Sequence, residues 1–200
     1  MSLTKIVEQS ISKLGENYLR NKRSYLTEAD TVYDLFSVLR NNLDLEKMRI
    51  HSELRPFYGE IDCPSVIRTI KGTTGWVMQK TALQGSLVDL SIIDVCEEHW
   101  NKAYKKAQKD QGLDDLEHLR FWRMLSYPVE AFRAIIEVKF KVYKNIGRIK
   151  KDIDKLDKIR EKNHECLVYL VILDRRAKKL GQIEKYSQEK NINCIVFRSS

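Results

Sequence analysis

The sequence contains little that would interrupt or cross-link regular structure. Only eight of its 200 residues are glycine and three are proline, so helices and strands should account for most of the chain. The four cysteines, Cys63, Cys96, Cys166 and Cys194, include no CxxC pair, which argues against a disulfide framework and a structural zinc site. Cys96 and His99 are three residues apart, but no second pair of ligands follows them, so a metal site is not expected there.

Long apolar runs are also missing. The longest, over residues 166–173, has the length of a buried strand and is far shorter than the ~18–20 residues that span a bilayer. The N-terminus lacks the basic, apolar and small-residue succession of a signal peptide. We therefore expect a cytoplasmic protein with no membrane partner.

The charge is unbalanced. Lys and Arg number 36 against 28 Asp and Glu, which gives a formal net charge of +8, and hydrophobic residues make up 42% of the chain. That hydrophobic share is sufficient for a packed core and too high for a disordered chain. The positive charge favours a polyanionic partner, nucleic acid before an anionic membrane surface.

Hydrophobic periodicity predicts a chain that alternates between helices and strands. Expected helices cover residues 1–20, 27–39, 45–54, 146–159 and 175–190; expected strands cover 73–79, 86–95, 131–140, 167–173 and 192–197; residues 96–127 fit two short helices. The closing strand–helix–strand unit implies a parallel pair with a right-handed crossover. We expect one α/β domain over residues 1–200, with N-terminal helices over 1–44 and a core over 45–200 that carries 96–127 as a helical insertion.

The triplet Glu137-Val138-Lys139 is the first candidate for chemistry. In a strand, Glu137 and Lys139 point to the same side and Val138 to the other. Charges within an apolar strand are costly unless they are paired or used. A salt-bridged pair at a strand end is one explanation, and a reactive site is the other.

Asp89 lies in a second apolar strand. If the two strands are antiparallel neighbours, Asp89 and Glu137 can bring their oxygens to one hard cation such as Mg²⁺, and the Val138 backbone carbonyl would offer a further ligand. Lys139 could then position or deprotonate a water and stabilise the negative charge of an attacked phosphate. Asp94 is a second choice, because its odd offset from Asp89 places it on the opposite side of the strand.

The order Asp89 … Glu137-Val138-Lys139, followed by a helix and an aliphatic strand, resembles the PD-(D/E)xK nucleases of the restriction-endonuclease-like superfamily. The resemblance implies an α/β fold with an αβββαβ core, in which helices flank a mixed central sheet. Here that core would also have extra N-terminal helices and a helical insertion between its second and third strands. It implies that Asp89, Glu137 and Lys139 are catalytic, and that Glu53 supplies the further acid that many members carry on the preceding helix.

Basic residues downstream of the triplet fit a nucleic-acid contact. Lys141, Lys144 and Lys151 are the candidates for binding the phosphate backbone. The aromatic residues could stack on bases, but their helical spacing is more typical of core or subunit contacts; they are Trp100, Tyr104, Phe121 and Trp122.

The sequence thus predicts a Mg²⁺-dependent endonuclease that hydrolyses phosphodiester bonds in nucleic acid, DNA before RNA, with Mn²⁺ as a substitute metal. Two copies could pair as a homodimer, as many such nucleases do. One alternative is a catalytically inactive nucleic-acid-binding or regulatory module on the same fold. Another is an assembly subunit that uses the aromatic insertion as an interface.

Overall fold

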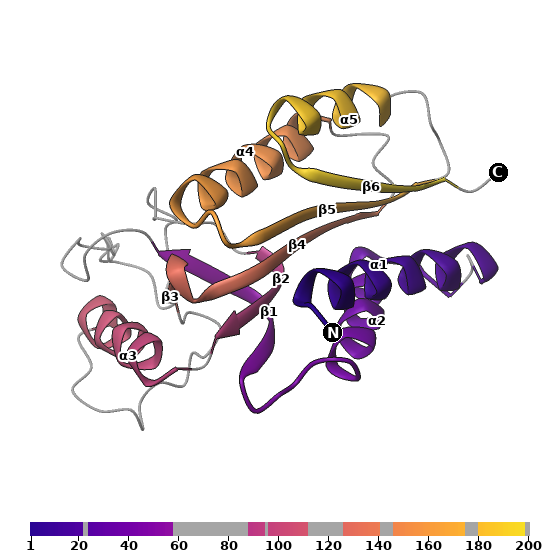
Figure 1. Cartoon of the computed structure of the whole chain (residues 1–200). Helices are drawn as coiled ribbons and strands as arrows, with labels where there is room; N and C mark the ends of the chain where they lie inside the picture. Colours follow the sequence, from indigo (N-terminus) through magenta and orange to yellow (C-terminus); the bar gives the residue numbers. More distant parts are fainter. Residues whose placement is uncertain are drawn as a thin grey trace, which may run out of the picture.

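The computed structural model describes residues 1–21, 24–57, 88–94, 96–111, 126–140, 146–174 and 180–198; of these, the side chains of 53–55, 57, 107–111 and 126 are not described. The strand expected over 73–79 and part of the expected insertion lie outside these ranges. Figure 1 shows the elements around one twisted sheet.

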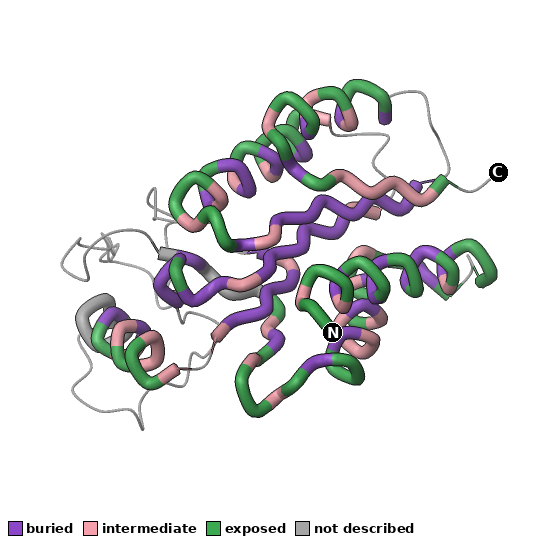
Figure 2. The backbone as a smooth tube through the Cα atoms, in the orientation of Figure 1, coloured by how far each residue is buried: buried purple, intermediate pink, exposed green. Residues whose placement is uncertain are grey.

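The sheet has six strands in the order β3-β1-β2-β4-β5-β6. Strands β1, β2 and β4 are antiparallel neighbours, whereas β4, β5 and β6 run parallel and β3 runs parallel to β1. The strand bounds are β1 Met48–Phe57, β2 Val88–Asp94, β3 Ser126–Pro128, β4 Phe132–Phe140, β5 Leu167–Asp174 and β6 Asn193–Arg198. Figure 2 shows that β4 and β5, at the centre, are buried over most of their length.

Helices cover both faces of the sheet. Helices α1 (Leu3–Arg20) and α2 (Glu28–Arg40) lie on one face, and α4 (Ile146–Lys162) and α5 (Leu180–Glu189) lie on the other (Figure 1). Each pair encloses its own apolar core against the strands. Helix α3 (Glu97–Gln111) and the short 3₁₀ helix Val129–Ala131 complete the described elements. None of the described helices combines the length and the apolar content needed to cross a bilayer.

Local sequence explains where several helices lie. Thr27 caps α2 through a reciprocal capping box with Asp30, which satisfies amides that the first turn leaves unpaired. In α4, Ile149, Ile153 and Leu156 recur at helical spacing and are buried against the sheet. These helices therefore form where their caps and apolar stripes predict.

The helix expected over residues 45–54 is wrong, because Met48–Phe57 forms strand β1. Leu45 and Met48 are three residues apart and Ile50 and Leu54 are four apart, as in a helix, but Met48, Ile50 and Leu54 also share the even positions of one strand face, so the pattern alone is ambiguous. Pairing decides the outcome: β1 lies antiparallel to β2, with Met48 opposite Asp94 and Leu54 opposite Val88. The first core strand is therefore β1, directly after α2.

The remaining order agrees with the expected αβββαβ architecture. Helix α2 precedes β1, β2 and β4, and α4 connects β4 to its parallel neighbour β5. Helix α3 stands between β2 and β4, where a helical insertion was expected, but the end of the expected insertion forms strand β3 because it pairs with β1. The chain has a mixed α/β fold whose central sheet is flanked by helices.

Candidate active site

The pairing of β2 with β4 brings Asp89 and Glu137 together. Leu90 lies opposite Ile136 in this antiparallel pair, so one further step places Asp89 opposite Glu137. Residues directly opposite in an antiparallel pair point to the same face. Asp89 Oδ2 also accepts a hydrogen bond of 2.8 Å from the Val138 backbone amide, which fixes its carboxylate beside β4.

Lys139 joins the two acids. Its Nζ lies 3.2 Å from Asp89 Oδ2 and 3.2 Å from Glu137 Oε2. The Val138 side chain faces the opposite core, under α1 and α2, and is fully buried there. The structure thus brings together the three side chains that the sequence singles out, from two strands 48 residues apart in the chain.

Three residues that the sequence did not identify complete the cluster. From α4, Lys155 donates to Glu137 Oε1, and Asp152 Oδ2 lies 3.4 Å from Lys139 Nζ. Lys155 Nζ is also 3.6 Å from Asp152 Oδ1. From the first turn of α2, Glu28 Oε1 lies 3.8 Å from Lys139 Nζ. Elements on both faces of the sheet therefore contribute to one site at the C-terminal end of β4.

The cluster is partly buried and contains more acid than base. Only 1% of the Glu137 side chain is exposed, against 15% for Lys139 and 25% for Asp89. Among the residues that the structure describes, four carboxylates share two ammonium groups, which leaves a formal charge of −2 when all are ionised. An excess of negative charge in so enclosed a place is unfavourable without a further cation.

Burial and the neighbouring charges both shift the pKa values in this cluster. Burial raises the pKa of Glu137 to about 7, and the charge of Asp89 adds to that rise, although Lys155 and Lys139 oppose it. Burial also raises the pKa of the Glu28 carboxyl. For Lys139, burial lowers the pKa, but the surrounding carboxylates, Glu137 first, outweigh burial and the net shift is upward. Lys139 is therefore an ammonium ion at neutral pH.

The donor set fits a hard divalent cation. All four acids offer oxygen, the ligand that Mg²⁺ prefers, and their excess charge of −2 equals what such an ion would neutralise. The Lys139 ammonium lies where the carboxylate oxygens converge. Asp89 and Glu137 are the most central candidates for metal ligands.

The other predicted site residues lie elsewhere or outside the described part. Glu53 is in strand β1, not on a helix, and its side chain is not described; the acid from the preceding helix α2 that does reach the site is Glu28. Asp94, at the far end of β2, forms an ion pair of 2.9 Å with Arg133 and takes no part in the Asp89 cluster. Glu53 lies on a strand rather than a helix because strand β1 pairs with β2.

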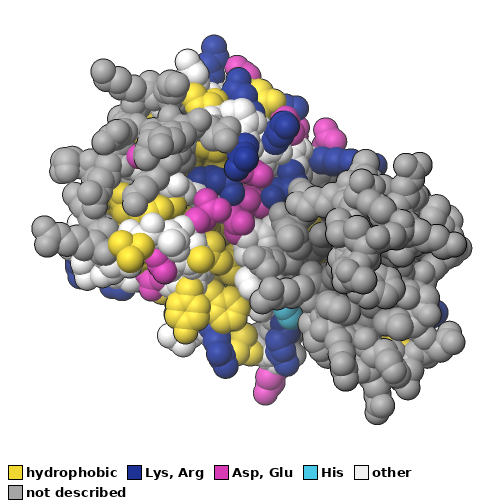
Figure 3. Space-filling model, turned by 180° about the vertical axis from the view of Figure 1, so that it is seen from behind, with side chains coloured by type: hydrophobic (Ala, Val, Ile, Leu, Met, Phe, Trp, Pro, Cys, Tyr) yellow, Lys and Arg dark blue, Asp and Glu magenta, His cyan; other side chains and the backbone are white. Residues whose placement is uncertain are grey.

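Lys151 is exposed on α4, whereas Lys141 and Lys144 lie outside the described residues. On the face shown in Figure 3, acidic side chains gather near the centre with Lys and Arg side chains beside them. A basic surface for nucleic acid on this face would therefore adjoin acidic groups.

The described aromatic residues of the insertion serve the core. Trp100 and Tyr104 pack against the apolar cluster beneath α4 and α5, and the Trp100 ring lies 6.5 Å from that of Tyr127. Phe121 and Trp122 fall outside the described residues. Cys166 is buried and Cys194 partly so, as expected of small core residues.

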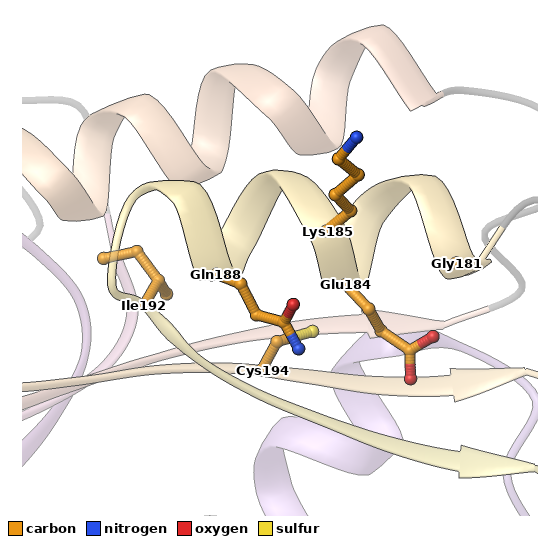
Figure 4. A pocket seen from close by; sticks show the side chains of 6 residues that line it. All are labelled: Gly181, Glu184, Lys185, Gln188, Ile192 and Cys194. Carbon is orange, nitrogen blue, oxygen red and sulfur yellow. The ribbon is translucent and has the colours of Figure 1, made fainter.

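A surface hollow of about 420 Å³ lies between α5 and β6 (Figure 4). Its lining residues are Gly181, Glu184, Lys185, Gln188, Ile192 and Cys194. Glu184 is bound to Arg198, at 2.7 Å, so this acid is already paired. The hollow has none of the residues of the candidate active site.

A weak signal for two of the missed residues was present. Asp152 and Lys155 are three residues apart and flank the apolar stripe of α4, so their side chains can turn toward the sheet. In the sequence alone, these two residues belong to a run of alternating acids and bases, which is typical of a solvent-exposed helix face. Glu28 had no such signal, because an acid in the first turn of a capped helix is explained by the helix dipole.

Comparison with known proteins gives distant matches. No family model matches the sequence, and no curated protein matches it closely enough to count as a relative. Among solved structures, the chain is similar to NucC of E. coli MS115-1 in a cAAA-bound form, with a TM-score of 0.47, 9% identity, and coverage of 94% of this chain and 70% of that one. It is also similar to NucC of P. aeruginosa ATCC27853 in a cAAA-bound form, with a TM-score of 0.42, 8% identity, and coverage of 87% and 64%. This chain spans less than three quarters of either structure, and the likeness concerns the arrangement of the chain, not its chemistry.

Proposed function

We propose that this chain is a nuclease that hydrolyses phosphodiester bonds in nucleic acid with Mg²⁺ as its cofactor, Mn²⁺ as a substitute metal, and DNA as the favoured substrate. The observation that carries the proposal is the acid-rich cluster around Lys139, where Asp89 and the almost fully buried Glu137 each place an oxygen 3.2 Å from the ammonium nitrogen. A balanced structural ion pair would not need the additional acids Glu28 and Asp152.

Asp89 and Glu137 would hold the metal, together with the backbone carbonyl of Val138. Glu28 and Asp152 would assist directly or through water, because their carboxylates border the same ammonium group. When bound, Mg²⁺ supplies a Lewis acid for a phosphoryl oxygen and lowers the pKa of a bound water. Glu137 must be ionised to be a ligand, and Lys155 favours its ionised form by donating to Oε1.

Lys139 would act as a fixed positive charge. Since its pKa is raised, the side chain is protonated at neutral pH and cannot accept a proton from water in this state. An ammonium group can instead donate hydrogen bonds that orient a water and stabilise the charge that develops on an attacked phosphate. The sequence allowed Lys139 either to position a water or to deprotonate it. The contacts with carboxylates favour a Lys139 that positions the water and stabilises the charge on the phosphate, and not one that removes a proton from the water.

Substrate binding would draw on the positive net charge of +8. Exposed lysines such as Lys151 would contact the phosphate backbone without reading base sequence, and the affinity would fall steeply with salt. A homodimer in which each copy cuts one strand is compatible with this proposal.

The test is a titration of Mg²⁺ and Mn²⁺ against supercoiled plasmid, linear duplex and single-stranded DNA, and RNA. We expect cleavage that requires the metal and is lost in Asp89→Asn, which removes a ligand charge without changing side-chain size. Asp157→Asn is the matched control, because Asp157 pairs with Arg160 and Lys190 away from the site. Cleavage at the wild-type rate in Asp89→Asn would refute the assignment.

Binding without cleavage under every metal would also refute it. That outcome would support the alternative function, a nucleic-acid-binding or regulatory module on the same fold, in which Lys139 merely contacts phosphate. A salt-dependent gel-shift assay on the same substrates would measure this binding directly.

A further inference from the structure

A second cluster of metal-ligating side chains lies where β2 leads into α3 (Figure 1). Asp94 is the last residue of β2, Cys96 immediately precedes the helix, and His99 is in its first turn. The three come from six consecutive positions. They lie five residues along β2 from Asp89, which corresponds to roughly 16 Å of extended strand. This cluster is therefore separate from the candidate active site.

The three donors converge. One carboxylate oxygen of Asp94, the Cys96 sulfur and a ring nitrogen of His99 all lie within 4.8 Å of one another. In a tetrahedral zinc site, bond lengths of ~2.0–2.3 Å place neighbouring donors about 3.5 Å apart. The three side chains are partly exposed, so small rotations can close that difference.

His99 supplies an independent observation. Its Nδ1 atom is buried and has no hydrogen-bond partner among the described residues. A buried polar atom without a partner costs free energy, and such atoms call for an explanation such as an ion or a water. A metal ion bound within the cluster, or a water on that ion, would provide the missing partner.

Arg133 supports the same arrangement. It donates to Asp94 Oδ2 at 2.9 Å and is itself held by Glu165 Oε2 at 3.1 Å. A carboxylate has about four lone-pair sites, so Asp94 can accept from Arg133 and still bind a metal. Outer contacts of this kind orient the ligands of metal sites.

We propose that Asp94, Cys96 and His99 form a binding site for one Zn²⁺ ion, with the fourth position open to water or another ligand. The donor types select the metal: thiolate and imidazole favour Zn²⁺, whereas Mg²⁺ prefers oxygen alone. From the sequence no metal site was expected at Cys96 and His99, because no second Cys or His pair follows them; the third ligand is instead a strand aspartate. Its position would fasten α3 to the end of β2.

The experiment is a titration of the purified, metal-free full-length chain with Co²⁺, followed by competition with Zn²⁺. Because only a thiolate ligand gives a sulfur-to-cobalt charge-transfer band, Co²⁺ bound at the Asp89 cluster would not contribute. We expect one equivalent of Co²⁺ to produce the band and Zn²⁺ to abolish it. In Cys96→Ser the band should vanish, and in His99→Gln the affinity should fall by more than about 100-fold, beyond the usual effect of losing an outer contact.

Cys194→Ser is the matched control, since Cys194 is a partly buried thiol on β6 outside this cluster. It should keep both the band and the affinity. Circular dichroism would verify that each variant is folded. A wild-type chain that gives no charge-transfer band, or a band that persists in Cys96→Ser, would overturn the proposal. Asp89→Asn should leave the charge-transfer band unchanged whether or not the chain is a nuclease.

Discussion

Helix α4 takes part in two ionic clusters that differ in burial and balance. Near its middle, Asp152 and Lys155 meet Glu137 and Lys139 of β4, together with further acids from β2 and α2. One turn later, Asp157 pairs with Arg160 at 3.1 Å and with Lys190 at 2.9 Å.

The second cluster has one acid for two bases among the described residues, and its Asp157 and Lys190 side chains are 11% and 38% exposed. Its composition needs no partner beyond the protein. In the described part of the chain, the first has four acids for two bases around a carboxylate that is 1% exposed. The difference indicates that charge excess combined with burial, and not the mere presence of ion pairs, distinguishes a candidate reactive site from structural support.

The largest expected difference between the clusters is in catalysis. Lys139→Met removes the ammonium group that touches four carboxylates, and we expect the cleavage rate at saturating Mg²⁺ to fall by about 10²–10⁴-fold. Lys190→Met, which removes an ammonium from the second cluster, should leave the rate within about twofold. Initial rates of plasmid cleavage measure the effect of each variant. Equal rates in Lys139→Met and Lys190→Met would contradict the assignment of the reactive site to the first cluster.

The next effect is on stability. Lys155→Met leaves the buried Glu137 carboxylate with one ammonium partner fewer, and we expect unfolding free energy to fall by about 3 kcal/mol. Lys190→Met should cost less than about 1 kcal/mol, because the pair is partly solvated. Urea unfolding of both variants checks this, and a larger loss for Lys190→Met would contradict it.

The stability of the metal-free chain should also depend on pH through Glu137. Its pKa is about 7 when folded against 4.5 for the free group, so the folded state binds the proton more tightly. The protonated Glu137 carboxyl therefore stabilises the folded chain at low pH. This stabilisation is lost as the pH rises from 4.5 to about 7, and the free energy of unfolding falls by at most about 1 kcal/mol per pH unit. Urea unfolding in the presence of a chelator measures this slope. Glu137→Gln should flatten it, and an unchanged slope in that variant would assign the titration to another group.

The smallest effect is stabilisation by the metal itself. At a Mg²⁺ concentration tenfold above its dissociation constant, we expect the free energy of unfolding to rise by about 1 kcal/mol. Asp89→Asn should abolish this increase, while Asp157→Asn should retain it. Thermal unfolding with and without Mg²⁺ provides the measurement, and equal stabilisation of both variants would show that the ion binds elsewhere.

Strong local patterns were sufficient to predict much of the fold. The capping box at Thr27, the apolar stripe of α4 and the aliphatic run of β5 each form the expected element, because local hydrogen bonds and one-sided burial depend on nearby residues. The region around Ile50 could not be predicted in this way. Its apolar spacing fits two periods, and only pairing with β2 makes it a strand.

The amino-acid sequence by itself determined that Glu137 and Lys139 share one side of a strand, because alternation is a property of the extended backbone. It also determined the net positive charge and the helix that follows. Only the tertiary structure decided that Asp89 lies opposite Glu137 and that Glu28, Asp152 and Lys155 join them. Sheet register and helix placement arise from packing between distant segments, so the excess of acid over base in the site is visible only after those segments have met.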